Sequence, residues 1–129
     1  MLLLLLLLWT SEPTEVEAAG RLDYSVSRCG VFGWHASENE RLARFKLLVA
    51  EGTGQSREDV LEEFRRGVRF AYSREGEILE TTTTPAGRAR WVAETEARCD
   101  RIARDHPALL RRTPDTAGRW AQVFVEQAD

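Results

Sequence analysis

The chain has 129 residues, a length that suits one domain rather than two. Its hydrophobic fraction of 43% and charged fraction of 30% are those of an ordinary globular protein, which argues against a disordered or fibrous chain. The net charge is −3 and no segment is strongly basic, so the chain lacks the electrostatic footprint of a general nucleic-acid binder.

Seven consecutive leucines, Leu2 to Leu8, follow the initial Met. The run is too short to span a bilayer as a helix, which takes about 20 apolar residues. Its length suits the apolar part of a signal peptide and Ala18 ends a possible cleavage site, but no Lys or Arg precedes the run and three acidic residues follow it before that site. A buried strand, a helical turn and a low-complexity leader are the other interpretations.

We therefore expect two parts: a leucine-rich leader with an acidic linker over 1–20, and a single domain over 21–129. The expected location is cytoplasmic, with export by a weak signal peptide at 1–18 as the alternative.

Alternation of apolar and polar residues over 22–27 predicts a half-buried strand, and 29–35 then reads as a turn or a second short strand. A helix over 37–51 follows. Ser37 and Glu40 form an S-x-x-E capping box at its start, an apolar stripe runs along one face, and Gly52 stops it.

The segment 56–84 predicts a helix followed by a β-hairpin. Ser56 and Asp59 begin a helix that we expect to end at Gly67, because glycine favours helix C-termini. Alternation then predicts a strand over 68–73, a turn over 73–76 with Gly76 in the left-handed conformation, and a β-branched return strand over 78–84.

Thr84 and Pro85 predict the start of another helix, with a hydroxyl cap and proline at the first helical position. Pro107 ends this helix near residue 105. A short helical turn over 108–112 and a final strand over 120–125 complete the expected elements. The fold class is therefore α+β: a small single domain of two to three amphipathic helices with a β-hairpin and short flanking strands.

The two cysteines and two histidines do not match a metal or catalytic motif. Cys29 and His35 have the spacing C-x5-H, and Cys99 and His106 have C-x6-H, neither of which is the usual zinc pattern. No nucleophile elbow or protease signature surrounds either cysteine, so we expect no catalytic residue, no metal ligand and no cofactor. A Cys29–Cys99 disulfide is the alternative to two reduced thiols, and it requires export to an oxidising compartment.

The order of the expected elements over 37–105 resembles a winged-helix DNA-binding module. The segment TTPAGRA at 83–89 is similar to the T-x-x-G-R stretch that leaves the wing in MarR- and PadR-type regulators. The resemblance implies that 56–66 is the recognition helix, although this helix also carries carboxylates that repel phosphates. In this alternative the DNA-binding residues are Arg57, Arg65, Arg66 and the wing residue Arg74.

Our leading hypothesis is a small, non-enzymatic protein that binds another protein, as antitoxins, immunity proteins and inhibitors do. The expected contact is an acidic helix surface that complements a basic partner. Its residues are Glu58, Asp59, Glu62 and Glu63.

Overall fold

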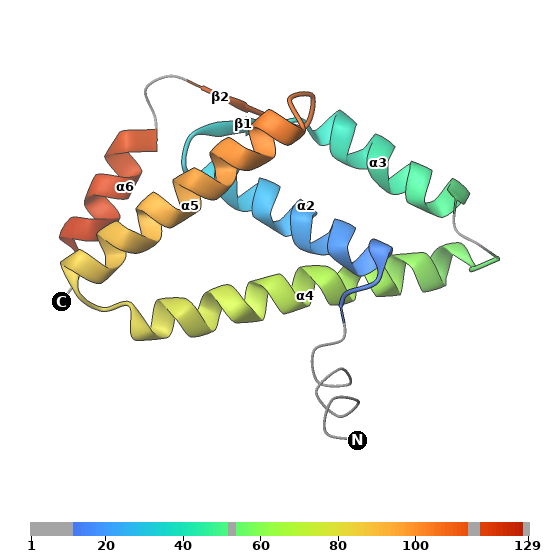
Figure 1. Cartoon of the computed structure of the whole chain (residues 1–129), viewed down its shortest axis with the longest axis horizontal. Coiled ribbons are helices and arrows are strands. Elements are labelled where there is room, and N and C mark those ends of the chain that lie inside the picture. The colour runs from blue at the N-terminus through green and yellow to red at the C-terminus, as the bar shows by residue number, and fades with distance from the viewer. Residues whose placement is uncertain (1–11, 52–53, 114–116, 128–129) are drawn as a thin grey trace.

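The structure is a computed structural model that describes residues 12–51, 54–113 and 117–127. Helices make up 78% of these residues, and a single pair of short strands accompanies them (Figure 1). The expected α+β class is therefore wrong, and the domain is mostly helical. The leucine run lies outside the described residues, so its interpretation stays a prediction.

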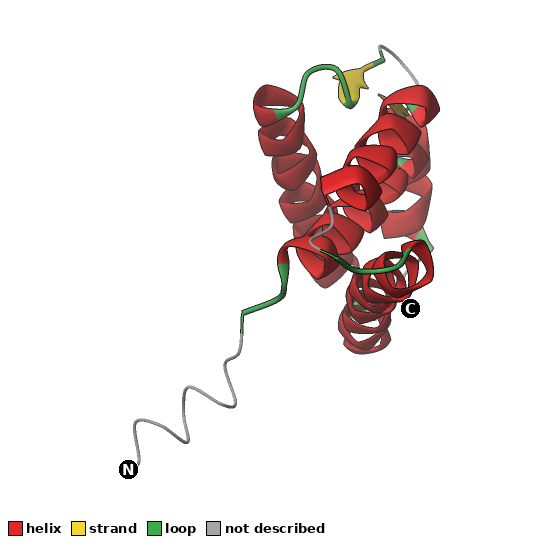
Figure 2. Ribbon diagram, turned by 90° about the vertical axis from the view of Figure 1, so that its right-hand side faces the viewer, coloured by secondary structure: helices red, strands yellow, loops and turns green. Residues whose placement is uncertain are grey.

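The elements follow the order α2 (Glu15–Val31), β1 (Trp34–Ala36), α3 (Glu38–Glu51), α4 (Arg57–Thr81), α5 (Pro85–Asp105), β2 (Leu110–Arg112) and α6 (Ala117–Glu126). The strands β1 and β2 pair antiparallel, with Trp34 opposite Arg112. Figure 2 shows this small ribbon at one end of the helices. Strand β1 follows α2 and strand β2 follows α5, so their pairing links the C-terminal ends of these two helices.

The starts of α3 and α5 are confirmed. The Ser37 hydroxyl accepts a hydrogen bond from the Glu40 backbone N–H at 3.3 Å, and the Thr84 hydroxyl accepts one from the Gly87 N–H at 3.0 Å. Each hydroxyl satisfies a backbone donor that has no partner inside its helix. Short-range capping chemistry is thus enough to locate both helices.

The hairpin expected over 68–84 is wrong, because α4 continues without a break from Arg57 to Thr81. Gly67 is not a helix end. It is buried, and a Cβ atom there would lie 2.0 Å from the carbonyl oxygen of Glu17 on α2. Glycine therefore serves the close approach of two helices, and packing against α2 overrides the β propensity of the segment. Without a hairpin there is no wing, so the winged-helix architecture is also wrong.

Three further expectations are corrected at the two ends of the domain. The segment 22–27 is helical within α2, where Val26 and Cys29 are buried. The final strand expected over 120–125 lies in helix α6, whereas 108–112 contains β2 in place of a helical turn. In each case the pattern covers only five or six residues, too few to separate the helical period from the strand period, and tertiary packing decides between them. Helix α2 also begins at Glu15, inside the expected linker.

The core lies between α2, α5 and the strand pair. Its buried residues are Val26, Cys29, Phe32, Trp34, Trp91, Cys99, Ile102, Leu109 and Leu110. Helix α4 joins this core mainly through its long contact with α2. Helix α3 lies apart from it at the side of the molecule, as Figure 1 shows.

Candidate functional site

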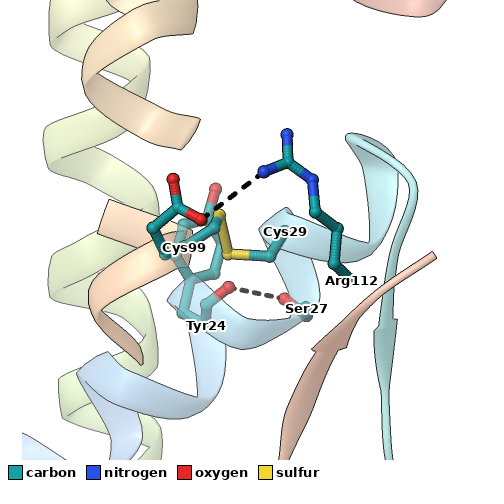
Figure 3. Close-up of a disulfide and its surroundings, with 6 residues drawn as sticks. Tyr24, Ser27, Cys29, Cys99 and Arg112 are labelled. Atoms are coloured by element: carbon teal, nitrogen blue, oxygen red, sulfur yellow. Dashed lines mark hydrogen bonds and ion pairs between the residues drawn. A yellow bond between two sulfur atoms is a disulfide. The ribbon is translucent and has the colours of Figure 1, made fainter. Parts of the chain in front are cut away.

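The two cysteines form a disulfide between α2 and α5. The sulfur atoms of Cys29 and Cys99 are 2.08 Å apart, and both residues are buried (Figure 3). An ion pair between Arg112 of β2 and Asp100 of α5, at 3.7 Å, lies beside the bridge. The sequence left open whether the cysteines are two reduced thiols or a disulfide, and the structure contains the disulfide. In this state neither sulfur is a thiolate nucleophile or a metal ligand.

The histidines do not gather with other ligating side chains. His35 is exposed on β1, and the Nδ1 atom of His106 lies 3.4 Å from a guanidinium nitrogen of Arg44. Within residues 12–51, 54–113 and 117–127, no three His, Cys, Asp or Glu side chains come together in a way that could hold a metal ion.

The acidic residues expected to contact a partner lie in the first two turns of α4. Glu58, Asp59 and Glu62 are exposed, and Glu63 is partly exposed. Glu62 pairs with Arg69 at 2.8 Å, and the hydrogen bond and charge of Arg69 lower the pKa of the Glu62 carboxyl.

The arginines of the DNA-binding alternative share this part of α4. Arg57, Arg65 and Arg66 are exposed in the same three turns as the acidic residues, whereas Arg74 lies farther along α4. Helical spacing places Glu62, Arg65 and Arg66 on one solvent-facing side of α4. The structure thus intermixes the two expected patches, so neither is a surface of a single sign.

The apolar stripe expected along one face of α3 is at most partly covered, because no residue of this helix is buried. Leu42 is 53% exposed and Leu47 is 57% exposed. The aromatic ring of Phe45 reaches α4, with its centroid 5.3 Å from that of Phe64. Apart from this contact, α3 leaves much of its apolar surface uncovered.

A cleft of about 220 Å³ separates α3 from α2 and α4. Most of its lining is apolar: Ala19, Leu22, Phe45, Leu47, Leu48, Phe64 and Leu109. The charged part of the lining consists of Asp23, Arg41, Arg44 and Glu51. This cleft is the candidate site, and we call it the α3 cleft.

An ion pair spans the α3 cleft and holds α3 to α2. Arg41 donates two hydrogen bonds to Asp23, at 2.8 and 2.9 Å, and a third to Glu38 at 2.7 Å. The hydrogen bond to Asp23 is the main cause of the raised pKa of the Arg41 guanidinium. A two-pronged pair of this kind fixes the orientation of both side chains. It therefore sets the position of α3 without filling the cleft.

No protein family model, curated protein or solved structure matches this chain. Among the described helices, none combines the length and the apolar character needed to cross a membrane. The site must therefore be interpreted from its own chemistry. The sequence did not single out Leu47, because this residue lies off the helical stripe formed by Leu42, Phe45, Leu48 and Val49.

Proposed function

We propose that this protein is an exported helical domain that binds another protein through the α3 cleft. The observation that carries the binding role is the α3 helix itself, which has no buried residue and two leucines that are more than half exposed. Uncovered apolar surface on a folded domain marks interaction sites, because water contact with it is unfavourable.

The disulfide supports the export part of the proposal. Buried disulfides form and persist in oxidising compartments, whereas cytosolic thiols are kept reduced. The Cys29–Cys99 bridge joins α2 to α5 through two cysteines that are 70 residues apart in sequence. Export agrees with the alternative location expected from the sequence, but a cut after Ala18 would remove the first turn of α2, which begins at Glu15. In this proposal export replaces the expected cytoplasmic location.

The chemistry of the cleft favours an apolar helical segment as its occupant. Seven of the eleven lining side chains are apolar. Of the charged ones, Asp23 and Arg41 form an ion pair and neutralise each other. A volume of about 220 Å³ suits two or three aliphatic side chains, each of which fills on the order of 100 Å³ at protein packing density. Side chains spaced by three or four residues on an amphipathic helix have this arrangement.

Two leucines of α3 provide a matched test of the binding site. Leu47 lines the α3 cleft, whereas Leu42 has similar exposure but lines a separate hollow on the other flank of the helix. We expect Leu47→Glu to weaken binding of a leucine-striped amphipathic peptide at least tenfold, because it places a charge in the apolar cleft. Leu42→Glu should bind the peptide as the wild type does.

The readout is fluorescence anisotropy of the labelled peptide, with circular dichroism to show that both variants fold. No peptide binding, or equal weakening by both variants, would contradict the α3 cleft as the site. If Glu62→Arg/Glu63→Arg weakens binding and Leu47→Glu does not, the contact lies on the acidic surface of α4 instead.

Export is tested separately. The full chain with a C-terminal tag is expressed, the cells are fractionated, and thiol alkylation with mass measurement reports the cysteines. We expect the chain outside the cytoplasm with both cysteines oxidised. Reduced, full-length protein in the cytoplasm would overturn export and leave the binding proposal to its own test.

A further inference from the structure

A second hollow lies where α2, α4 and α5 meet, away from the α3 cleft. It has a volume of about 250 Å³, and residues of all three helices line it. Its apolar lining is Phe70, Ala71, Ile78 and Trp91, and its polar lining is Arg21, Tyr24, Ser25, Arg74, Glu75 and Arg98. We call it the arginine hollow.

Three of its arginines have no acidic partner. Arg21, Arg74 and Arg98 form no ion pair with any residue that the structure describes. Instead, the Arg21 guanidinium stacks on the Phe70 ring, with its central carbon 3.7 Å from the ring centroid. Three positive charges therefore surround the hollow without a matching carboxylate.

The single carboxylate in the lining is already engaged. Glu75 forms an ion pair with Arg28 and accepts a hydrogen bond from the Tyr24 hydroxyl at 3.0 Å. The charge of Glu75 is thus balanced by Arg28, which lies outside the lining. The positive charge of Arg21, Arg74 and Arg98 remains available to a ligand.

Buried polar atoms without a hydrogen-bond partner gather around the same hollow. In the described part of the chain these atoms are the Nε atom of Arg21 and the hydroxyl of Thr95, whereas the Nε atom of Arg28 faces Glu75 in their ion pair. Arg21 lines the hollow, Arg28 pairs with Glu75, and Thr95 lies between Trp91 and Arg98 on one face of α5. Buried polar atoms in folded proteins nearly always have a partner, so an unpaired donor at a cationic hollow indicates a missing acceptor.

We infer that the arginine hollow binds a small amphipathic anion, with a carboxylate or phosphate head and an apolar body. Guanidinium groups match the geometry of both heads and bind them with charge-assisted hydrogen bonds. The apolar body would cover Phe70, Ile78 and Trp91, which a bare inorganic anion would leave in contact with water. This inference does not depend on the α3 cleft or on export.

The test titrates the full chain with octanoate, octyl phosphate, inorganic phosphate and octylammonium, all below micelle-forming concentrations, by calorimetry. We expect at least one of the two octyl anions to bind and inorganic phosphate to bind at least about tenfold more weakly than that anion. We expect octylammonium not to bind. The relative affinity of octanoate and octyl phosphate identifies the preferred head group.

Two double variants of exposed arginines locate the binding. Arg74→Gln/Arg98→Gln removes two charges from the hollow, and Arg101→Gln/Arg104→Gln removes two from a different part of α5. We expect the first double variant to weaken binding about tenfold or more, because charged hydrogen bonds to the ligand are lost. The second should leave the affinity within about twofold of the wild type.

Backbone amide shifts over 70–78 and 91–98 should change on titration and so place the ligand. No binding of either octyl anion, equal binding of inorganic phosphate, or equal weakening by the two double variants would overturn the inference.

Discussion

Gly20 and Gly67 lie at the crossing of α2 and α4, where each glycine contacts the backbone of the other helix. A Cβ atom on Gly20 would lie 2.1 Å from the carbonyl oxygen of Phe64, and one on Gly67 would lie 2.0 Å from that of Glu17. Real Cβ atoms do not approach backbone atoms so closely. The two helices can therefore touch only because both positions lack a side chain. This crossing is the main attachment of α4 to the rest of the domain.

Alanine at either glycine should separate the helices. We expect Gly20→Ala and Gly67→Ala each to lower the free energy of unfolding by about 3 kcal/mol or more, because backbone cannot give way as a flexible side chain does. Urea unfolding followed by circular dichroism measures the change.

Gly76 provides the control on the same helix as Gly67. It is exposed, and a Cβ atom there would meet nothing within 4 Å. Gly76→Ala should raise the free energy of unfolding by about 1 kcal/mol, the difference in helix propensity. If all three substitutions have similar effects, the close helix crossing is incorrect.

Loss of the Cys29–Cys99 bridge should destabilise the fold. The bridge joins residues with a sequence separation of 70 and so lowers the conformational entropy of the unfolded chain. On the entropic model this stabilises the folded state by about 4 kcal/mol. We expect Cys29→Ala/Cys99→Ala to lower the stability by about that amount, measured by urea unfolding. A reducing agent should destabilise the wild type similarly and leave the double variant unchanged. Equal stability with and without reductant would mean that the bridge is absent.

Thr95 offers a stabilising substitution. Its side chain is 3% exposed and its hydroxyl has no hydrogen-bond partner within the described residues. Valine has nearly the same shape and avoids the cost of burying an unpaired hydroxyl. We expect Thr95→Val to raise the free energy of unfolding by about 1 kcal/mol. A loss of similar size would show that the hydroxyl has a partner, such as a bound water.

Tyr24 should titrate at a higher pH than an ordinary tyrosine. Burial, followed by the hydrogen bond to Glu75, raises the pKa of Tyr24 from 10.0 to about 12. Near-ultraviolet absorbance during an alkaline titration should therefore show an ionisation near pH 12, and Tyr24→Phe should remove it. If Tyr24→Phe removes an ionisation near pH 10 instead, the buried contact with Glu75 is incorrect.

The same shift predicts a pH dependence of stability. The folded state holds the Tyr24 proton more tightly than the unfolded state does, so the stabilising contribution is complete below pH 10 and is lost as pH rises from 10 toward about 12. The melting temperature should fall less steeply over this range in Tyr24→Phe than in the wild type. A parallel fall in both would contradict the shift.

Local chemistry determined the parts of the fold that the sequence predicts correctly. The Ser37 and Thr84 caps, and the helices that they begin, depend on groups within four residues of one another. The sequence also named Cys29 and Cys99 as a possible pair. It did not reveal the α3 cleft or the arginine hollow, because each is lined by residues from several separate elements.

The segment 68–84 and the stripe of α3 show what only the tertiary structure decided. The β-branched residues of 78–84 favour a strand. Gly67, however, allows α4 to pack closely on α2. Burial along that contact keeps α4 helical beyond Gly67, as far as Thr81. The periodicity of α3 predicts a helix with one apolar face, and the structure covers that face only in part, with no residue fully buried. Sequence by itself determined where apolar faces and caps lie, since both follow from near neighbours. Which faces meet was decided by contacts between residues distant in the chain.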